Sequence, residues 1–239
     1  MSIKKSYKYS HSSKNCGQNY EFFYKKDNYD SRVWILEKET LEKIYSKYIK
    51  KTIINYLDFA CGTGRILEIF ERKAKNVYGV DVSKEMLKIA RSKFTKTKFS
   101  NIDLTRNRNH FNFKFNVITA FRFFLNAEPS LKEEALLIIN QILEDGGFLI
   151  FNIHANTYSS IYFLNRKKTI TLSLSEIKKL LKKFDFEIVK IFGIGYLPWE
   201  FSNVLSKKLW LLIERFFMNL KILNKFGTGL IILSKKVNK

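Results

Sequence analysis

The chain has few of the residues that build covalent or irregular scaffolds, since its 239 residues include two cysteines, two prolines and ten glycines. Two cysteines cannot form a disulfide framework, and this usage suits a reducing compartment. No apolar stretch approaches the roughly 18–20 residues that a membrane-spanning helix needs. The polar N-terminal residues also do not resemble a secretory signal. We therefore expect a cytoplasmic protein, soluble or peripheral at the inner face of the membrane.

Acidic residues are in the minority, with 22 against 43 basic residues and a formal net charge of +21. Residues 160–239 carry 16 basic and 5 acidic side chains, so this stretch contributes +11 of the net charge. Such an excess favours an anionic partner, for example RNA, anionic lipid or an acidic glycan. AT-rich coding would also enrich lysine without any partner, and lysine far outnumbers arginine here. The composition leaves both explanations open.

The most informative motif is a predicted strand that runs into a glycine turn, with the sequence LDFACGTG at residues 57–64. A second predicted strand, YGVD, ends at Asp81. A carboxylate at the tip of the second strand would lie beside the glycine turn, where it can hold the hydroxyl groups of a ribose. The turn leads into a helix whose free backbone N–H groups face the ligand. The pattern predicts a nucleoside-binding site.

The glycine spacing argues against a dinucleotide. A pyrophosphate-binding turn has the pattern G-x-G-x-x-G, whose third glycine allows the helix to pack closely beside the phosphates. Here Gly62 and Gly64 are followed by Leu67 at the third position. The chain also lacks the G-x-x-x-x-G-K-[ST] pattern of a P-loop. A nucleoside without phosphates fits this turn better.

These residues resemble those of the class I methyltransferases that depend on S-adenosylmethionine (SAM). The first motif of that family reads D/E-x-G-x-G-x-G, and here it runs from Asp58 to Gly64 with Ala60 in place of the first glycine. The resemblance implies that Asp58 lies near the methionine amino group of SAM and that Asp81 binds the ribose hydroxyls. It also implies that Met86 contacts the adenine and that Asp103 lies near the adenine amino group.

Further contacts with SAM are expected from neighbouring residues of the same turns and strands. These residues are Ala60, Gly62, Gly64, Val82, Ile102 and Thr119. Tyr29 and Arg32 precede the motif and are expected to reach the carboxylate of SAM, although plain core packing explains them equally well. No metal site is expected.

Strands alternate with helices along the chain, which indicates a parallel sheet covered on both faces. We expect an α/β fold with a doubly wound, mostly parallel sheet of seven strands, in which the last strand is antiparallel beside the sixth, as in Rossmann-like methyltransferases. The expected strands are 53–59, 76–80, 98–102, 115–119, 147–153, 186–194 and 230–233. The expected helices of the sheet domain are 65–73, 83–93, 131–143 and 174–184. Ser83 is the expected N-cap of the second helix, and capping boxes at Ser130 and Ser173 are expected to open the last two.

Two segments extend this domain. Residues 1–50 are expected to form a polar tail, frayed as far as residue 20, and a helical lid, leaving 51–239 as the methyltransferase domain. Residues 202–226 form a helical insertion before the last strand, with an apolar stripe that includes Leu209 and Phe216. This insertion either packs against the sheet or a second subunit, or acts as a platform for a hydrophobic substrate at a membrane. The basic residues that favour a membrane are Lys207, Lys208, Arg215 and Lys221.

Catalytic residues are expected in the loops after the fourth and fifth strands, because ligands bind beyond the carboxyl ends of parallel strands. The candidates are Thr119, Arg122, Asn126, Asn152, His154, Asn156 and Tyr158. Arg122 and Asn126 are expected to shape the pocket. Of the three histidines, His11 lies in the N-terminal tail and His110 in a basic loop, so His154 is the best-placed general base.

The sequence narrows the acceptor of the methyl group. The chain has no [DNS]-P-P-[YFW] loop, which is common in methylation of exocyclic base amines, and no cysteine nucleophile in the region used for C5 methylation of bases. We therefore expect a small-molecule, sugar or lipid-linked acceptor, methylated at oxygen. The alternatives are an RNA methyltransferase and a non-catalytic SAM-binding partner of another enzyme. The oligomeric state is left open.

Overall fold

The computed structural model describes residues 16–50, 52–154 and 172–238. Its strands are β1 (Ile53–Phe59), β2 (Ala74–Asp81), β3 (Lys98–Asn101), β4 (Phe115–Ala120), β5 (Leu143–His154), β6 (Phe186–Ile194) and β7 (Gly229–Lys236). Its longer helices are α2 (Cys16–Lys25), α3 (Tyr29–Ile44), α5 (Lys84–Lys93), α7 (Pro129–Ile142), α9 (Leu174–Lys183) and α11 (Lys207–Asn219). Its short helices are η1 (Tyr45–Ile49), α4 (Leu67–Phe70), α6 (Phe123–Asn126), α10 (Phe201–Val204) and η2 (Lys221–Leu223).

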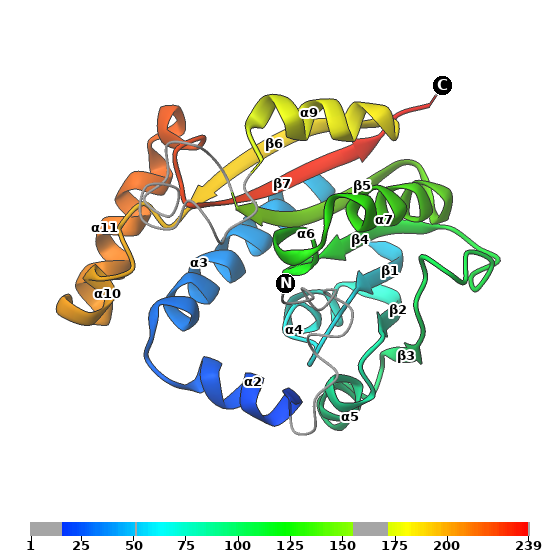
Figure 1. Cartoon of the computed structure of the whole chain (residues 1–239), viewed down its shortest axis with the longest axis horizontal. Coiled ribbons are helices and arrows are strands. Elements are labelled where there is room, and N and C mark those ends of the chain that lie inside the picture. Colours follow the sequence, from blue (N-terminus) through cyan, green and yellow to red (C-terminus); the bar gives the residue numbers. More distant parts are fainter. Residues whose placement is uncertain (1–15, 51, 155–171, 239) are drawn as a thin grey trace, which may run out of the picture.

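The strands form one seven-stranded sheet in the order β3-β2-β1-β4-β5-β7-β6 (Figure 1). Pairing is parallel from β3 to β5, whereas β7 runs antiparallel to both β5 and β6. This order confirms the expected doubly wound, mostly parallel sheet with an antiparallel last strand. The chain reverses its direction across the sheet between β1 and β4, and ligands bind in α/β sheets at such a reversal.

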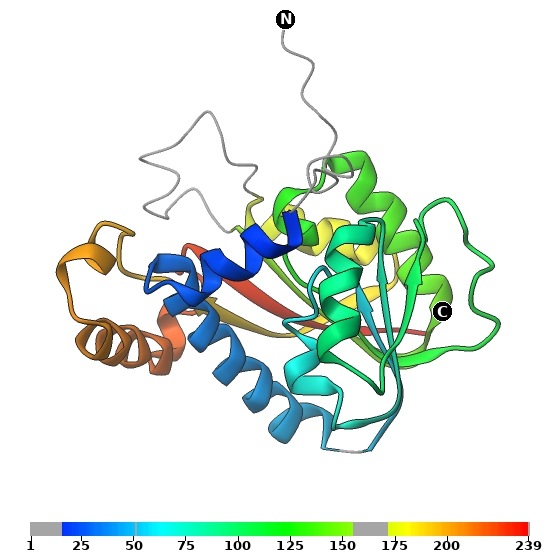
Figure 2. The same cartoon turned by 90° about the horizontal axis from the view of Figure 1, so that it is seen from below.

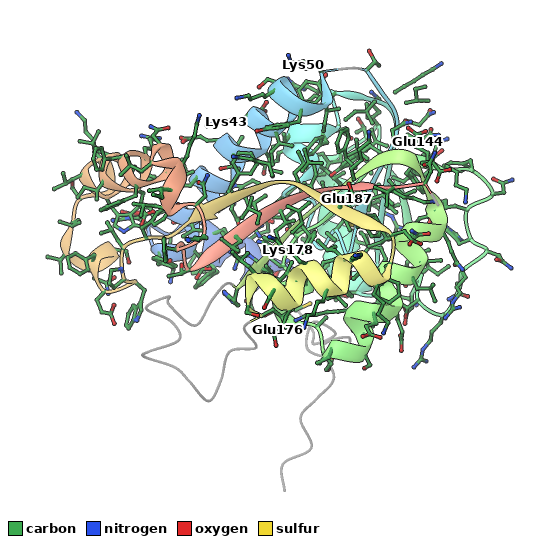
Figure 3. All side chains as sticks on the ribbon, turned by 90° about the horizontal axis from the view of Figure 1, so that it is seen from above. Lys43, Lys50, Glu144, Glu176, Lys178 and Glu187 are labelled. Carbon is green, nitrogen blue, oxygen red and sulfur yellow. The ribbon has the colours of Figure 1, made fainter. Side chains whose placement is uncertain are left out.

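Helices cover both faces of the sheet because strand residues alternate between two apolar clusters. Leu57 and Phe59 of β1 belong to the cluster that includes α7 and α9. Tyr56 belongs to the cluster that includes α3, α4 and Trp210 of α11. Most charged side chains lie outside these clusters, as Figure 3 shows for Glu176 and Lys178 of α9. Core side chains therefore cover both faces of the sheet, which leaves the ends of its strands for a binding site.

Residues 16–20 are helical, although the sequence suggests a frayed tail there. Helix α2 begins at Cys16. Gly17 packs so closely on α5 that a Cβ there would lie 2.9 Å from the carbonyl oxygen of Glu85, which explains this docking. Figure 2 shows α2 lying between α3 and α5, across the end of the sheet.

Several element boundaries differ from the sequence prediction, among them both ends of the helix after the glycine turn and the start of β5. The helix after the glycine turn covers Leu67–Phe70 rather than 65–73, because β2 already begins at Ala74, paired with Ile53. Strand β5 begins at Leu143 rather than at residue 147, and the register between β4 and β5 shifts near Phe115 to accommodate the extra residues.

Helix capping is predicted correctly at two of three sites. Ser83 caps α5, and the Ser173–Glu176 capping box opens α9. The capping box at Ser130 is wrong, since α7 begins at Pro129 with Glu128 as its N-cap residue. Proline has no N–H to satisfy and its fixed φ suits the first helical position, so it sets this start instead.

The insertion before β7 consists of α10, α11 and η2. In Figures 1 and 3 these helices lie beyond β6, at the end of the sheet opposite β3. Trp210 and Glu214 anchor α11 and are fully buried. The Glu214 carboxylate accepts hydrogen bonds from the backbone N–H groups of Tyr196 and Leu197, which fixes the chain after β6. No helix among the described residues is long and apolar enough to cross a membrane.

Candidate active site

The main cavity of the described structure lies at the carboxyl ends of β1, β2 and β4 and has a volume of about 220 Å³. It brings together ten of the residues singled out from the sequence. These are Asp58, Ala60, Gly62, Asp81, Val82, Met86, Ile102, Asp103, Arg122 and Asn126. The fold thus gathers all three aspartates around one space.

The glycine turn forms one wall of this cavity. Ala60, Gly62 and Gly64 all adopt positive φ, at 56°, 55° and 85°. A Cβ added at Gly62 would meet no atom within 4 Å, so this side of the turn is open for a ligand to approach the backbone. At Gly64 a Cβ would lie 2.6 Å from the ring of Phe94, so Gly64 serves the packing of the turn and does not line the cavity.

Asp58 presents an unsatisfied carboxylate oxygen. Its Oδ1 accepts a hydrogen bond of 2.8 Å from the hydroxyl of Thr119, which in turn lies 2.6 Å from the hydroxyl of Tyr56. Its Oδ2 is buried and has no hydrogen-bond partner in the described structure. Burial, together with the charge of Asp81, raises the pKa of Asp58 to about 7, although Thr119 and Arg65 lower it. A cationic amino group would satisfy this oxygen. Thr119 positions Asp58 from behind and does not line the cavity.

Asp81 ends β2 beside the glycine turn, and Asp103 follows β3; both line the cavity. The two oxygens of Asp81 accept hydrogen bonds of 2.8 Å from the backbone N–H groups of Gly62 and Ser83, which joins the two strand tips. Oδ1 of Asp103 accepts hydrogen bonds from the N–H and the hydroxyl of Thr105. Oδ2 of Asp103 lies 3.8 Å from the Nε of Arg106.

Helix α2 and Arg65 close the cavity on the remaining side. The Arg65 guanidinium lies 3.8 Å from the ring centroid of Tyr24 and 5.2 Å from that of Tyr20. Arg65 is buried, and its Nη1 has no hydrogen-bond partner in the part of the chain that is described. Sequence reasoning missed these three residues. The position of Arg65 directly after Gly64 and the four-residue spacing of the tyrosines are the signals that could have found them.

Tyr29 and Arg32 do not reach this cavity, so the prediction of a contact with the SAM carboxylate needs correction. Arg32 donates two hydrogen bonds of 2.8 Å to the carboxylate of Asp27 and one to the carbonyl oxygen of Leu205. Tyr29 packs edge-on against Trp210 and its hydroxyl lies 3.1 Å from that of Thr228. Both side chains hold α3 against the insertion. Arg65 is the buried cation at the cavity instead.

A second, smaller cavity of about 70 Å³ lies on the other side of Arg122. The side chain of Arg122 lines both cavities, and its Nη2 donates to Asp30 over 3.2 Å. Its backbone adopts a φ of 62° and donates to Oδ1 of Asn152, whose amide donates in turn to Glu37. Asn126 donates to the Arg122 carbonyl oxygen. Both predicted pocket residues thus order the loop after β4.

His154 lines the second cavity, together with Tyr29 and Asp30, and not the main one. Burial, followed by the positive charge of Arg122, lowers its pKa to about 4. The imidazole is therefore neutral near pH 7 and able to accept a proton. The other candidates near it, Asn156 and Tyr158, lie outside the described residues, as does His11. His110 is exposed and lies 3.1 Å from the hydroxyl of Ser100.

Comparison with known proteins identifies the family. Residues 32–191, which span two thirds of the chain, match the model of a methyltransferase domain family. The chain belongs to the class I SAM-dependent methyltransferases. This SAM-dependent methyltransferase is 29% identical over 212 residues to an uncharacterised protein of Methanocaldococcus jannaschii, and the match covers 76% of this chain and 75% of that protein. It is also 35% identical to the ubiquinone/menaquinone biosynthesis C-methyltransferase UbiE of Campylobacter jejuni, over 28% of this chain and 30% of that protein.

Solved structures share the fold of this methyltransferase. A SAM-dependent methyltransferase of Clostridium acetobutylicum has a TM-score of 0.60 at 20% identity, covering 94% of this chain and 100% of the other. The magnesium protoporphyrin IX methyltransferase of Synechocystis, crystallised with S-adenosylhomocysteine (SAH), has a TM-score of 0.57 at 14% identity, covering 84% and 83%. These structural similarities support the fold, and membership in the family indicates that the cofactor is SAM.

The main cavity fits SAM on two observations of this structure. The buried Oδ2 of Asp58 needs a donor, which the methionine ammonium provides, and the open side of Gly62 leaves room beside the backbone. We expect Arg65 to pair with the carboxylate of SAM, Asp81 with its ribose, and Met86 and Asp103 with its adenine. Among the described residues, no group of three or more His, Cys, Asp or Glu side chains could hold a metal ion.

Proposed function

We propose that this methyltransferase methylates a hydroxyl oxygen of a small-molecule, sugar or lipid-linked acceptor that reaches the site from the second cavity. The observation that carries this proposal is the position of His154 in a second cavity that shares Arg122 with the main cavity, where burial and the charge of Arg122 lower the pKa of the imidazole. When bound, SAM supplies an electrophilic methyl group on a sulfonium ion. A hydroxyl acceptor must lose its proton during the transfer, and the unprotonated imidazole of His154 is placed to take it. The lowered pKa makes His154 a weak base, which suffices where proton loss accompanies methyl transfer.

The residues around the second cavity have distinct roles in this proposal. His154 accepts the proton that the acceptor hydroxyl loses while the new O–C bond forms and the S–C bond breaks. Arg122 is a positioning residue, since its backbone and side chain are fixed by Asn152 and Asp30. Holding the nucleophile and the methyl carbon in line can lower the barrier by about 7–11 kcal/mol, so alignment contributes more than the strength of the base.

The test follows transfer of a labelled methyl group from SAM into fractions of a cell extract. His154→Ala should slow turnover about 100-fold or more, as expected for a lost general base, while its affinity for SAH stays that of the wild type. His110→Ala is the matched control, because His110 is exposed and lines neither cavity. Wild-type turnover by His154→Ala would remove the base from this proposal.

Other acceptors have less support. The match to UbiE, which is named a C-methyltransferase, covers 28% of this chain and says little about the acceptor atom. RNA is favoured only by the net charge of +21. A cytoplasmic location is part of this proposal and agrees with the low cysteine content.

A further inference from the structure

Exposed apolar side chains gather on the insertion before β7. Of the fourteen large apolar side chains that are exposed among the described residues, nine lie between residues 199 and 226, which we call the apolar arm. The four most exposed are Val204 at 81%, Ile222 at 79%, Leu212 at 64% and Phe216 at 61%. Isolated exposed apolar residues are ordinary, but a contiguous group of this size marks an interaction surface.

The exposed residues of α11 form a stripe of their own. Leu209, Leu212 and Phe216 follow one another at intervals of three and four residues, the spacing of one helix face. At 3.6 residues per turn this stripe lies on the side of the helix opposite the buried Trp210 and Glu214. Core packing therefore explains one face of α11 and leaves the other unexplained.

The charge of the apolar arm indicates what kind of partner covers it. It carries five basic residues and two acidic ones, of which Glu214 is fully buried. The basic residues are Lys207, Lys208, Arg215, Lys221 and Lys225. Arg215 pairs with Glu39 of α3, whereas Lys225 lies over the ring of Phe226. A second copy of this arm would bring like charges together, so self-association is disfavoured.

We propose that the apolar arm docks on the surface of an anionic lipid bilayer. A helix with an outer apolar stripe and flanking lysines lies in the plane of such an interface, with its apolar side chains among the acyl chains and its lysines at the headgroups. Trp199 and Phe201 lie at the start of the arm and are exposed, as aromatic residues are at membrane interfaces. This docking goes beyond methyl transfer and does not depend on the acceptor.

The test is sedimentation of the full chain with vesicles of phosphatidylcholine, or of phosphatidylcholine mixed with phosphatidylglycerol. The wild type should bind the mixed vesicles, bind neutral vesicles weakly, and lose affinity as salt is raised. Phe216→Glu should lower the partition coefficient by about tenfold or more, because one aromatic anchor is lost and a negative charge is gained. Ile54→Glu is the matched control: Ile54 is 54% exposed at the start of β1, away from the arm, and the charge change is the same.

Three outcomes would overturn the proposal. One is a wild type that stays in solution with both kinds of vesicle, and another is an equal loss of binding by Phe216→Glu and Ile54→Glu. The third is a dimer in analytical ultracentrifugation that Phe216→Glu dissociates, which would assign the arm to a second copy of the chain. Thermal unfolding and SAH titration without vesicles check the fold and the methyltransferase site separately, so failure of docking is distinguishable from failure of the proposed function.

Discussion

At the scale of single residues, Asp58 combines burial with an incomplete set of hydrogen bonds. One oxygen is held by Thr119, and the other has no partner in the described structure. A pKa of about 7 in the folded state, against 3.8 for an unperturbed aspartate, means that ionising Asp58 is unfavourable in the protein without ligand. The contribution of Asp58 to stability is therefore fully present below its pKa in the unfolded chain, and it is lost as the pH rises through its pKa in the folded protein.

This arrangement predicts that the ligand-free protein loses stability between about pH 4 and pH 7, by about 1.4 kcal/mol per pH unit from this group. Asp58→Asn should remove that slope. It should therefore raise the free energy of unfolding at about pH 8 by roughly 2–4 kcal/mol while weakening SAH binding by about tenfold or more. Urea unfolding at two pH values and calorimetry with SAH measure both effects. An Asn variant that is less stable at the higher pH would contradict this reading.

The glycine turn allows a paired comparison at two positions with positive φ. Ala60 stands where the family has glycine, and an alanine in this conformation costs about 1–2 kcal/mol. Ala60→Gly should therefore stabilise the protein by up to about 1 kcal/mol, because the relief of strain exceeds the extra conformational entropy that glycine loses on folding. The affinity for SAH should not change.

Gly62→Ala should do the opposite, because its Cβ would enter open space beside the expected cofactor at a φ of 55°. We expect a loss of about 1 kcal/mol in stability and a clear fall in SAH affinity. Thermal unfolding and calorimetry of the two variants check this pair. Wild-type affinity in Gly62→Ala would mean that no ligand approaches the turn.

At the scale of elements, α2 joins the site to the N-terminal region by way of Arg65. The guanidinium lies against the rings of Tyr20 and Tyr24, and its Nη1 is buried without a partner among the described residues. Stacked and buried in this way, Arg65 is fixed before a ligand arrives. Helix α2 thus orders the cation that we expect to pair with the carboxylate of SAM.

Arg65→Met should weaken SAH binding by about 10-fold to 100-fold, since hydrogen bonds to charged groups contribute about 1.5–3 kcal/mol. The same substitution should barely change the affinity for an SAH analogue that lacks the carboxylate. Calorimetry of both ligands with both proteins forms a double-mutant cycle. Equal losses for SAH and for the analogue would show that Arg65 acts on the fold of α2 and not on the ligand.

The sequence predicts the corner between β1 and β2 well because its signals are local. Asp58, Gly62 and Asp81 belong to one strand–turn–helix–strand unit, so their spacing nearly determines their arrangement. The Arg32 prediction is wrong because its partners, Asp27 and the Leu205 carbonyl, are set by how α3 meets the insertion. Local patterns do not contain such long-range contacts, and the same reason explains why the sequence does not predict that α2 packs on Arg65 or that His154 lines a separate cavity.

At the scale of the whole molecule, the sheet order brings the carboxyl ends of β1, β2 and β4 to one cavity and that of β5 to the next. Arg122 lies between the two, and Tyr29 connects the second cavity to Trp210 of the apolar arm. Cofactor site, proposed acceptor site and proposed membrane surface therefore follow one another along the molecule. The alternation of strands and helices predicts the sheet, whereas this succession emerges only from the packing.

The central claim is that three aspartates hold one SAM molecule in the main cavity, and calorimetric titration of the whole chain with SAH tests it most directly. We predict one binding site in the wild type and no measurable binding by Asp81→Ala, because the substitution removes the carboxylate that joins the two strand tips and that we expect to bind the ribose. Unchanged affinity in Asp81→Ala, or a wild type that binds NAD in place of SAH, would contradict the account.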